Sequence, residues 1–411
     1  MLIFSIETSC DETAIAILKF EKNGDFKVLA NQISSQIKIH AEWGGIVPNL
    51  AAREHAKNLL PVIQQTLKEA NLDLKQIDLF SVTQGPGLIP ALLLGTNVAK
   101  TLSYFYQKPL IGVHHIEGHI YSNFINKNQG SVRKSRNTLL SKVQGKTEQP
   151  NEVYSRINRA RNEGFDKEIC QNCSSFEFPI LNLVVSGGHT QLILMKNHLQ
   201  YEIIGETQDD AVGEAYDKVA KILGFEYPGG PIISAQATEA EKMVKNKTIN
   251  KKYLEIKFPR PMLQNPNLNF SFSGLKTAVL YFYQKLEKEN HTKEEWTIWN
   301  KFIAKAFQDA VVDVLKNKTL KAIKKHNLKT VLLSGGVSAN NKILETLKKE
   351  LKITYPKIVF NSPEKALCGD NAVMIGVAGI ARYLYSKNKK TFQTNWKDLE
   401  ASSSLKLKDL N

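Results

Sequence analysis

Cysteine is scarce in this chain, which has four among its 411 residues. Four thiols in a chain of this length do not build the disulfide framework of a small secreted protein, so we expect a reducing compartment, with the cytoplasm as the default. Cys170 and Cys173 form a single CxxC pair. Because no second pair accompanies it, the pair indicates a zinc or redox site only weakly, and an incidental thiol pair on a loop is the simpler interpretation.

Long hydrophobic runs are also missing. No apolar stretch reaches the roughly 18 residues that a membrane helix needs. The run Met1–Ile6 is typical of a strand, follows no basic segment and is too short for the core of a signal peptide. We therefore expect neither a signal peptide nor a contact with the membrane.

Acidic residues are outnumbered by basic ones, 40 to 55, which gives a formal net charge of +15. This excess favours a polyanionic partner or substrate such as nucleic acid, although many basic proteins bind none. With 42% hydrophobic and 23% charged residues the composition is that of an ordinary globular chain. The length allows about two or three domains, each with its own core.

Two segments of the sequence are similar in pattern, Leu2–Leu18 and Leu181–Met195. Each is an apolar run, a short polar or glycine-containing turn and a second apolar run, which predicts a β-hairpin with a buried face. Helical spacing follows in Ala51–Ala70 and Trp296–His326. The repetition predicts an α/β protein with mixed sheets and two lobes: residues 1–125, completed by about 366–390, and residues 179–365, with 391–411 as a tail.

Residues 126–178 separate the two predicted lobes and show no sustained periodicity. From Lys127 to Arg161 there are nine basic residues and two acidic ones. This composition predicts an irregular, basic insertion, which serves either as a solvated spacer or as an auxiliary arm that contacts RNA.

Three histidines lie within Gly112–His119, directly after an apolar run. If His115 lies in a helix, His119 follows about 40° round the axis, so both imidazoles can reach one ion. Asp370 precedes a long apolar helical run and is a candidate third ligand, or else an ordinary N-cap. Two histidines and one carboxylate would leave open positions on zinc or ferrous iron.

The metalloprotease pattern HExxH is absent, because Ile116 stands where the general-base glutamate would be. Glu117 would point to the far side of a helix from the two candidate ligands, so peptide hydrolysis is disfavoured. We expect His114 to pack or to support a ligand instead of binding the ion.

Three glycine-rich turns are candidates for holding phosphates with backbone N–H groups: Ser186–Thr190, Tyr227–Pro231 and Ser334–Asn340. None is a Walker P-loop or a GxGxxG fingerprint. Asp217 could accept hydrogen bonds from ribose hydroxyls and Asn340 from a base or ribose edge, or each could be an ordinary helix residue.

Asp11 and Glu12 fall in the turn of the first predicted hairpin. Paired carboxylates there could orient a metal-bound water or a phosphate, or simply cap the backbone. Gln84–Leu88 ends an apolar run and opens a helix, which could add N–H donors. Lys276 is a candidate contact to an anion or to RNA, and equally an ordinary solvated lysine.

Taken together, the motifs resemble those of the tRNA threonylcarbamoyladenosine transferase family (TsaD), in the family's order and over nearly the whole chain outside the insertion. They are IETSCDET (Ile6–Thr13), GGIVP (Gly44–Pro48) with AREH (Ala52–His55), GPGL (Gly85–Leu88), HHIEGH (His114–His119), VSGGHT (Val185–Thr190), GEAYDK (Gly213–Lys218), FSFSGLK (Phe270–Lys276) and the run from SGGV (Ser334–Val337) to Asn340.

The resemblance implies a two-lobed actin-like, sugar-kinase-like fold (a duplicated RNase H-like fold), with a nucleotide and a metal in the cleft between the lobes. By the family pattern His115, His119 and Asp370 hold one divalent metal per subunit, iron(II) or alternatively zinc, and Asp11 and Glu12 lie beside the reacting group. The residues implied to bind threonylcarbamoyl-adenylate are Val184, Val185, Ser186, Gly187, Gly188, Asp217, Gly230 and Asn340.

The implied reaction transfers a threonylcarbamoyl group from threonylcarbamoyl-AMP to the N6 amine of the adenosine 3′ to the anticodon, in tRNAs that read codons beginning with A. The implied partners are tRNA, a separate synthase that makes the adenylate, a TsaB-like paralogue and a TsaE-like ATPase.

This sequence departs from the family pattern at Asn49, where the family usually has a glutamate, and in the length of the insertion. Two alternatives stay open beside the transferase: a metal-independent sugar- or acetate-type kinase of the same fold, and a non-catalytic scaffold paralogue. The histidine pair argues against both, since the scaffold paralogues lack it and such a kinase needs no metal held between two histidines.

Overall fold

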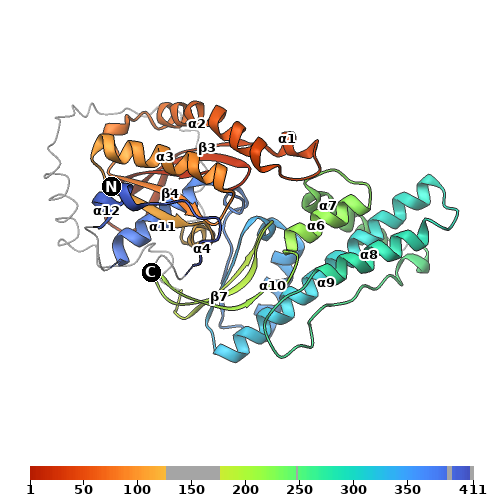
Figure 1. Ribbon diagram of the computed structural model, residues 1–411. Helices are drawn as coiled ribbons and strands as arrows, with labels where there is room; N and C mark the ends of the chain where they lie inside the picture. Colours follow the sequence, from red (N-terminus) through yellow and green to blue (C-terminus); the bar gives the residue numbers. More distant parts are fainter. Residues whose placement is uncertain (126–175, 247–248, 387–390, 408–411) are drawn as a thin grey trace.

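The computed structural model describes residues 1–125, 176–246, 249–386 and 391–407. Figure 1 shows two α/β lobes, one built mainly from the N-terminal residues and one from the middle of the chain. The predicted basic insertion, with Cys170 and Cys173, lies outside the described residues.

The first lobe contains a five-stranded sheet in the order β3-β2-β1-β4-β5. The antiparallel pairs β1–β2 and β2–β3 make up one side, and β4 and β5 run parallel to β1. The first predicted hairpin is therefore confirmed. The strands are β1 (Leu2–Glu7), β2 (Glu12–Phe20), β3 (Phe26–Ser35), β4 (Leu79–Gly85) and β5 (Leu110–His114).

The second lobe repeats this arrangement with a sheet in the order β10-β9-β6-β7-β8. Here β6, β7 and β8 form the antiparallel half, and β9 and β10 run parallel to β6. The two sheets thus share strand order and orientation, which confirms the duplicated two-lobed fold. The strands are β6 (Ile180–Val185), β7 (Thr190–Asn197), β8 (Gln200–Glu206), β9 (Thr330–Ser334) and β10 (Val359–Asn361).

The helices of the first lobe cover both faces of its sheet. On one side α2 (Pro48–Ala70) packs against β2 and β3, and α3 (Ile89–Tyr106) against β4. On the other side α11 (Ala372–Tyr385), which comes from near the end of the chain, packs against β1, β2, β4 and β5. Its first eleven residues are buried, as its apolar sequence predicts. The shorter helices here are α1 (Ile37–Ala41), α4 (His115–Tyr121) and α12 (Thr391–Asp398).

The second lobe is dominated by α9 (Lys293–His326), which packs along α7. Thr292 and Glu295 form a capping box at its start, and Asn327 ends it in the left-handed conformation. The predicted helix Trp296–His326 is therefore confirmed, with one extra turn at its start. The other helices are α6 (Val212–Ile222), α7 (Gly229–Lys245), α8 (Ser273–Leu286) and α10 (Asn341–Thr354).

Each lobe has its own apolar core, and a further buried cluster joins the two lobes. This joining cluster contains Val113 and Ile375 of the first lobe together with Val184, Met195 and Leu332 of the second. The lobes are therefore packed against each other on the side of α4 and α11. In the part of the chain that the structure describes, no helix combines the length and apolar composition needed to cross a membrane.

Close packing of α11 on the sheet makes a testable prediction at Gly379. A Cβ built at this position would stand 2.7 Å from Ser81 Cβ on β4. We expect Gly379→Ala to lower the free energy of unfolding by about 1–3 kcal/mol, because an added methyl group displaces its packed neighbours. Thermal unfolding measures the change. Gly274→Ala on α8 is the control, since an added Cβ there would have Pro261 Cγ as its nearest neighbour, at 4.0 Å. Equal unfolding temperatures for the two variants would contradict the close approach.

Candidate metal centre and the groups that face it

The buried helix α4 begins directly where the edge strand β5 ends, so its first residues are fixed by the sheet. His114, the last residue of β5, caps the helix: its Nδ1 accepts from the N–H of Ile116 at 3.1 Å. Its Nε2 lies 3.0 Å from the carbonyl oxygen of Leu405 and donates to it. Both ring nitrogens are used, so His114 supports the helix and has no lone pair for a metal. Burial lowers the pKa of His114 to about 3, which keeps the ring neutral.

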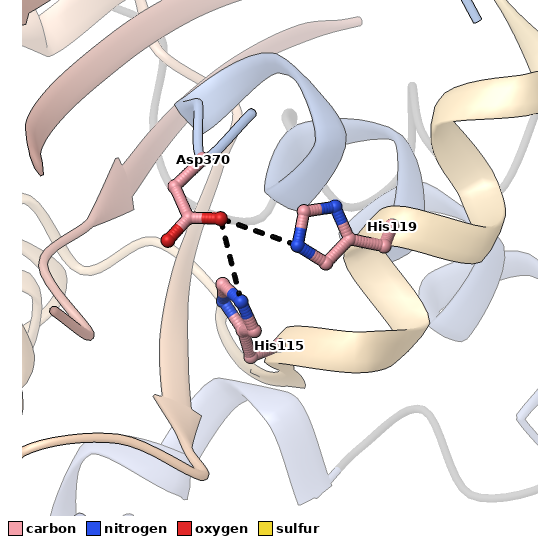
Figure 2. A group of neighbouring side chains, drawn as sticks. All are labelled: His115, His119 and Asp370. Atoms are coloured by element: carbon pink, nitrogen blue, oxygen red, sulfur yellow. Dashed lines mark ion pairs between the residues drawn. The ribbon is translucent and has the colours of Figure 1, made fainter. Parts of the chain in front are cut away.

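His115 and His119 project from the same face of α4 toward Asp370, which precedes α11 (Figure 2). The Nε2 atoms of His115 and His119 lie 3.5 and 3.2 Å from Asp370 Oδ1. One ligand atom from each of the three residues can be chosen so that all lie within 4.8 Å of one another. Ligand atoms about 2.1 Å from a tetrahedral ion are about 3.4 Å apart, so this spacing fits a shared cation.

The surroundings of His119 also suit a metal ligand. Its side chain is fully buried, and neither of its ring nitrogens has a hydrogen-bond partner. The 3.2 Å contact of Nε2 with Asp370 therefore lacks hydrogen-bond geometry. A buried imidazole with no partner is costly unless something else satisfies it. A metal ion between His115, His119 and Asp370 would do so.

Glu7 supports His115 from behind. This fully buried carboxylate lies at the end of β1, with Oε2 3.3 Å from His115 Nδ1, and it also accepts hydrogen bonds from Ser9 N–H and Thr83 Oγ1. A carboxylate on Nδ1–H fixes the tautomer and directs the Nε2 lone pair toward the ion. Sequence reasoning missed this role, although Glu7 lies within the IETSCDET motif and a carboxylate at the end of a buried strand was the signal.

The two buried carboxylates of this cluster, Asp370 and Glu7, are stable as anions only with a positive charge beside them. Burial alone lowers the pKa of His115, but the carboxylates of Asp370 and Glu7 more than offset it and raise the pKa to about 9. Burial opposes ionisation of Asp370 and Glu7 as well, yet His115 holds both carboxyl pKa values below their usual range. Two buried carboxylates are thus balanced by an imidazolium or by a bound cation.

Asp370 is not the N-cap of α11, which was the alternative from the sequence. The cap is Asn371, whose side chain accepts from the N–H of Met374 at 3.0 Å. The neighbouring residue therefore does the capping, and the Asp370 carboxylate is directed at the two histidines.

Asp11 lies in the turn between β1 and β2 and Glu12 begins β2, both near enough to Asp370 for its charge to act on them. Burial, followed by Asp370, raises the pKa of Asp11. Burial raises the pKa of Glu12 to about 7, with the charges of Asp11 and Asp370 adding to the effect and a hydrogen bond from Ser35 Oγ opposing it. A carboxyl that titrates near neutrality can accept or release a proton in a reaction at physiological pH.

His55 of α2 braces this acidic turn, which gives the AREH motif a structural reason. Its Nε2 donates to the carbonyl oxygen of Cys10 at 2.9 Å, and its Nδ1 lies 2.7 Å from Thr13 Oγ1. Burial lowers the pKa of His55, in keeping with a neutral ring that donates on one side and accepts on the other.

The glycine-rich turn after β6 reaches the candidate metal centre from the second lobe. His189 carries the evidence, since burial and then the charges of His115 and His119 lower its pKa to about 4. Ser186 closes the turn, with its N–H donating to the His189 carbonyl oxygen at 2.8 Å. A Cβ at Gly187 or Gly188 would meet no neighbouring atom within 4 Å, so the side-chain positions of both glycines face open space.

The other residues predicted to bind the adenylate differ in their burial and in their hydrogen bonds. Val184 and Val185 are fully buried, so only their backbone groups could meet a ligand. Asp217 accepts from the N–H of Gly229 at 2.7 Å, and its pKa is raised by burial and by Asp11 across from it. A Cβ at Gly230 would meet open space.

Asn340 has less freedom than the sequence suggested. Its Oδ1 caps α10 by accepting from the N–H groups of Lys342 and Ile343, and its Nδ2 donates to Gln308 Oε1 at 2.9 Å. The side chain that was expected to accept from a base or ribose is therefore already bonded. Lys276 likewise pairs with Asp210 at 3.4 Å, so it is not simply solvated.

The sequence did not predict a role for the Tyr227 side chain, because the turn Tyr227–Pro231 was interpreted only through its glycines. The pKa of Tyr227 is raised by burial and then by the charges of Asp11 and Asp217, so its phenol lies near both carboxyls.

Comparison with known proteins gives a consistent picture. The family model described as TsaD, tRNA N6-adenosine threonylcarbamoyltransferase, matches residues 27–167 and 163–377. Proteins with the name tRNA N6-adenosine threonylcarbamoyltransferase are 42% identical in Thermosipho africanus, over 99% of this chain and all of that one, and 41% in Persephonella marina, over 93% and 90%. The solved structure of full-length HypF in its phosphate- and nucleotide-bound form is similar in fold, with a TM-score of 0.51 and 13% identity, over 94% of this chain and 47% of that one.

The pKa of Glu12 leads to a prediction about stability and pH. Its folded-state pKa of about 7 lies above the ordinary value of 4.5, so ionisation destabilises the fold as pH rises through this interval. We expect Glu12→Gln in metal-free protein to match the wild type below pH 4.5 and to become progressively more stable than it up to about pH 7. Thermal unfolding at a series of pH values measures the difference.

The exposed Glu42 provides the control, because Glu42→Gln removes the same charge without relieving a buried carboxylate. If the stability of Glu12→Gln differed from that of the wild type by the same amount at every pH, the raised pKa of Glu12 would be contradicted.

Proposed function

The chain belongs to the tRNA N6-adenosine threonylcarbamoyltransferase family, and we propose that it transfers the threonylcarbamoyl group of threonylcarbamoyl-AMP to tRNA. The acceptor is the N6 amine of the adenosine 3′ to the anticodon, in tRNAs that read codons beginning with A. The observation that carries the proposal is the meeting of His115, His119 and Asp370 with the glycine-rich turn of the other lobe.

The metal of the proposed site is a single divalent ion, for which we favour iron(II) over zinc on the family resemblance. Two imidazoles and one carboxylate suit either ion and leave coordination positions open. When bound by His115, His119 and Asp370, the ion would supply positive charge that orients and polarises an acyl or phosphate oxygen.

The protein's own groups would hold the adenylate around this centre. The side-chain positions of Gly187 and Gly188 face open space, and their backbone can donate N–H groups to an anionic oxygen. Val184, Val185 and Ser186 set the position of that turn. Gly230 would offer backbone, and Asp217 would hydrogen-bond to the nucleotide with its second oxygen.

Asp11 and Glu12 are the proposed catalytic residues. In the reaction the N6 amine attacks the carbamoyl carbon, the bond to the AMP oxygen breaks, and the amine must lose one proton. Glu12, with its pKa raised to about 7, is suited to receive this proton near neutral pH. Asp11 would orient the amine by accepting its second N–H.

Asn340 was expected to contact the adenylate, and its bonds define the contact we retain. Because its Oδ1 caps α10, we propose that Asn340 fixes the start of that helix. Its Nδ2, which donates to Gln308, is the group that would contact the adenylate.

The proposed partners follow from the same reaction. The charge of +15 suits a tRNA substrate, whose phosphates attract a basic surface over a distance. A separate synthase would supply the adenylate, and a TsaB-like paralogue and a TsaE-like ATPase would assist. A cytoplasmic location is proposed with them. The comparisons favour neither the small-molecule kinase nor the scaffold paralogue.

The metal site is tested by elemental analysis of protein purified without oxygen or chelators. We expect about one iron or zinc per chain in the wild type, and less than about a tenth of this in His115→Ala/His119→Ala, because one carboxylate alone binds such ions weakly. His326→Ala, at the end of α9, is the control and should keep its metal. Equal metal contents in all three proteins would contradict the site.

The reaction is tested by mass spectrometry of tRNA nucleosides. In a strain with no second homologue, loss of the gene should remove threonylcarbamoyladenosine from tRNA digests, and the wild-type gene should restore it. We expect the Glu12→Gln gene to restore at most about a hundredth as much when the reaction is followed at limiting enzyme, since general-base catalysis contributes about 10²–10⁴-fold. An unchanged nucleoside content after gene loss would refute the proposed reaction.

A further inference from the structure

Glu117 is a fully buried carboxylate that lies between the two histidines of α4 and takes no part in the proposed reaction. Its Oε2 accepts from Nε of Arg382 on α11, and its Oε1 accepts from the hydroxyl of Tyr201 on β8 at 2.8 Å. The Arg382 side chain is itself only 6% exposed. A buried ion pair costs desolvation of both charges, so stability alone is a weak reason for its presence.

The position of Glu117 places it opposite the metal ligands on the helix. It stands two residues after His115 and two before His119, about 200° round the axis from each. The histidines therefore face Asp370 while Glu117 faces Arg382. The short helix α4 is held from both sides.

Both faces of α4 contact residues of α11 or of the segment just before it. Asp370 stands just before α11, and Arg382 lies twelve residues further on, about 18 Å along that helix. Between them Gly118 allows close packing, because a Cβ there would stand 2.8 Å from Ile375 Cδ1 and 3.1 Å from Met374 Cγ. The relative position of α4 and α11 is thus fixed at three points.

Tyr201 extends this connection to the other lobe. It lies on β8, where it pairs with Met195 in the second sheet. One carboxylate therefore joins the helix with two ligands, the helix that follows the third ligand, and the lobe that carries the glycine-rich turn.

We infer that Glu117 and Arg382 are positioning residues, which hold α4 against α11 so that His115, His119 and Asp370 can share one ion. The inference rests on the proposed metal site. Ligands from two separate segments must be held within about 0.5 Å of their productive geometry. The pair supplies this because the buried carboxylate of Glu117 would lose its cationic partner if α4 moved away from Arg382.

The test measures Co²⁺ binding to metal-free protein by the visible absorption that appears when Co²⁺ gains protein ligands. Glu117→Gln/Arg382→Met removes both charges of the pair and keeps similar side-chain volumes. We expect the dissociation constant for Co²⁺ to rise about 10- to 100-fold, the loss usual for groups that orient metal ligands. Tyr201→Phe keeps the ion pair, removes one hydrogen bond and should raise the constant by a smaller factor.

Asp313→Asn is the matched control, since it breaks the Arg260–Asp313 ion pair in the second lobe, away from the cluster. It should leave Co²⁺ binding unchanged. Thermal unfolding of each metal-free variant separates stability from binding, and titration is done well below the unfolding temperature.

The outcomes distinguish the positioning role from the metal site itself. Weaker Co²⁺ binding in folded Tyr201→Phe or in the double variant, with Asp313→Asn like the wild type, supports the inference. A lower unfolding temperature with unchanged Co²⁺ affinity in the variants that fold overturns it and leaves the pair merely structural. A wild-type protein that binds no Co²⁺ overturns the proposed site and the positioning role with it.

Discussion

The arrangement of side chains where the two lobes meet follows from one requirement: the negative charge of carboxylates buried there must be balanced by a positive charge. Glu7 and Asp370 are carboxylates of the interior, and His115 lies between them with its pKa raised to about 9. His119, fully buried with no hydrogen-bond partner, completes a set of donors that suits a cation. The strand ends, the cap of His114 and the cap of Asn371 all serve to aim these side chains. A chain of supporting bonds, from Thr83 through Glu7 to His115, then fixes which nitrogen of His115 faces Asp370.

The duplicated fold gives this centre its surroundings. Each sheet ends its first hairpin at the junction of the lobes: the first contributes the acidic turn of Asp11 and Glu12, and the second the turn from Ser186 to His189. The buried cluster that contains residues of both sheets packs the two lobes together. The first lobe supplies carboxyls whose pKa values are raised and the second supplies glycines whose side-chain positions are open, an arrangement suited to moving a proton beside a bound anion.

Supporting residues account for much of what the motifs contain. In the AREH motif His55 braces the acidic turn, and in HHIEGH Glu117 bonds to Arg382 and Tyr201. Asn340 holds the start of α10. Motif residues of this kind bond to other protein groups around the centre.

The sequence alone determined the two hairpins, the long helices and the spacing of His115 and His119, because these follow from local periodicity. The resemblance between motifs added the family and favoured Asp370 as a candidate third ligand over an N-cap, the two interpretations that the residues alone had left open. Only the tertiary structure decided that Asn371 and not Asp370 caps α11, that Glu7 lies behind His115, and that the Asn340 oxygen is already bonded. These outcomes depend on contacts between residues up to several hundred positions apart, such as Glu7 with His115 and Glu117 with Arg382. A one-dimensional pattern holds no information on the distances and burial that fix such partners.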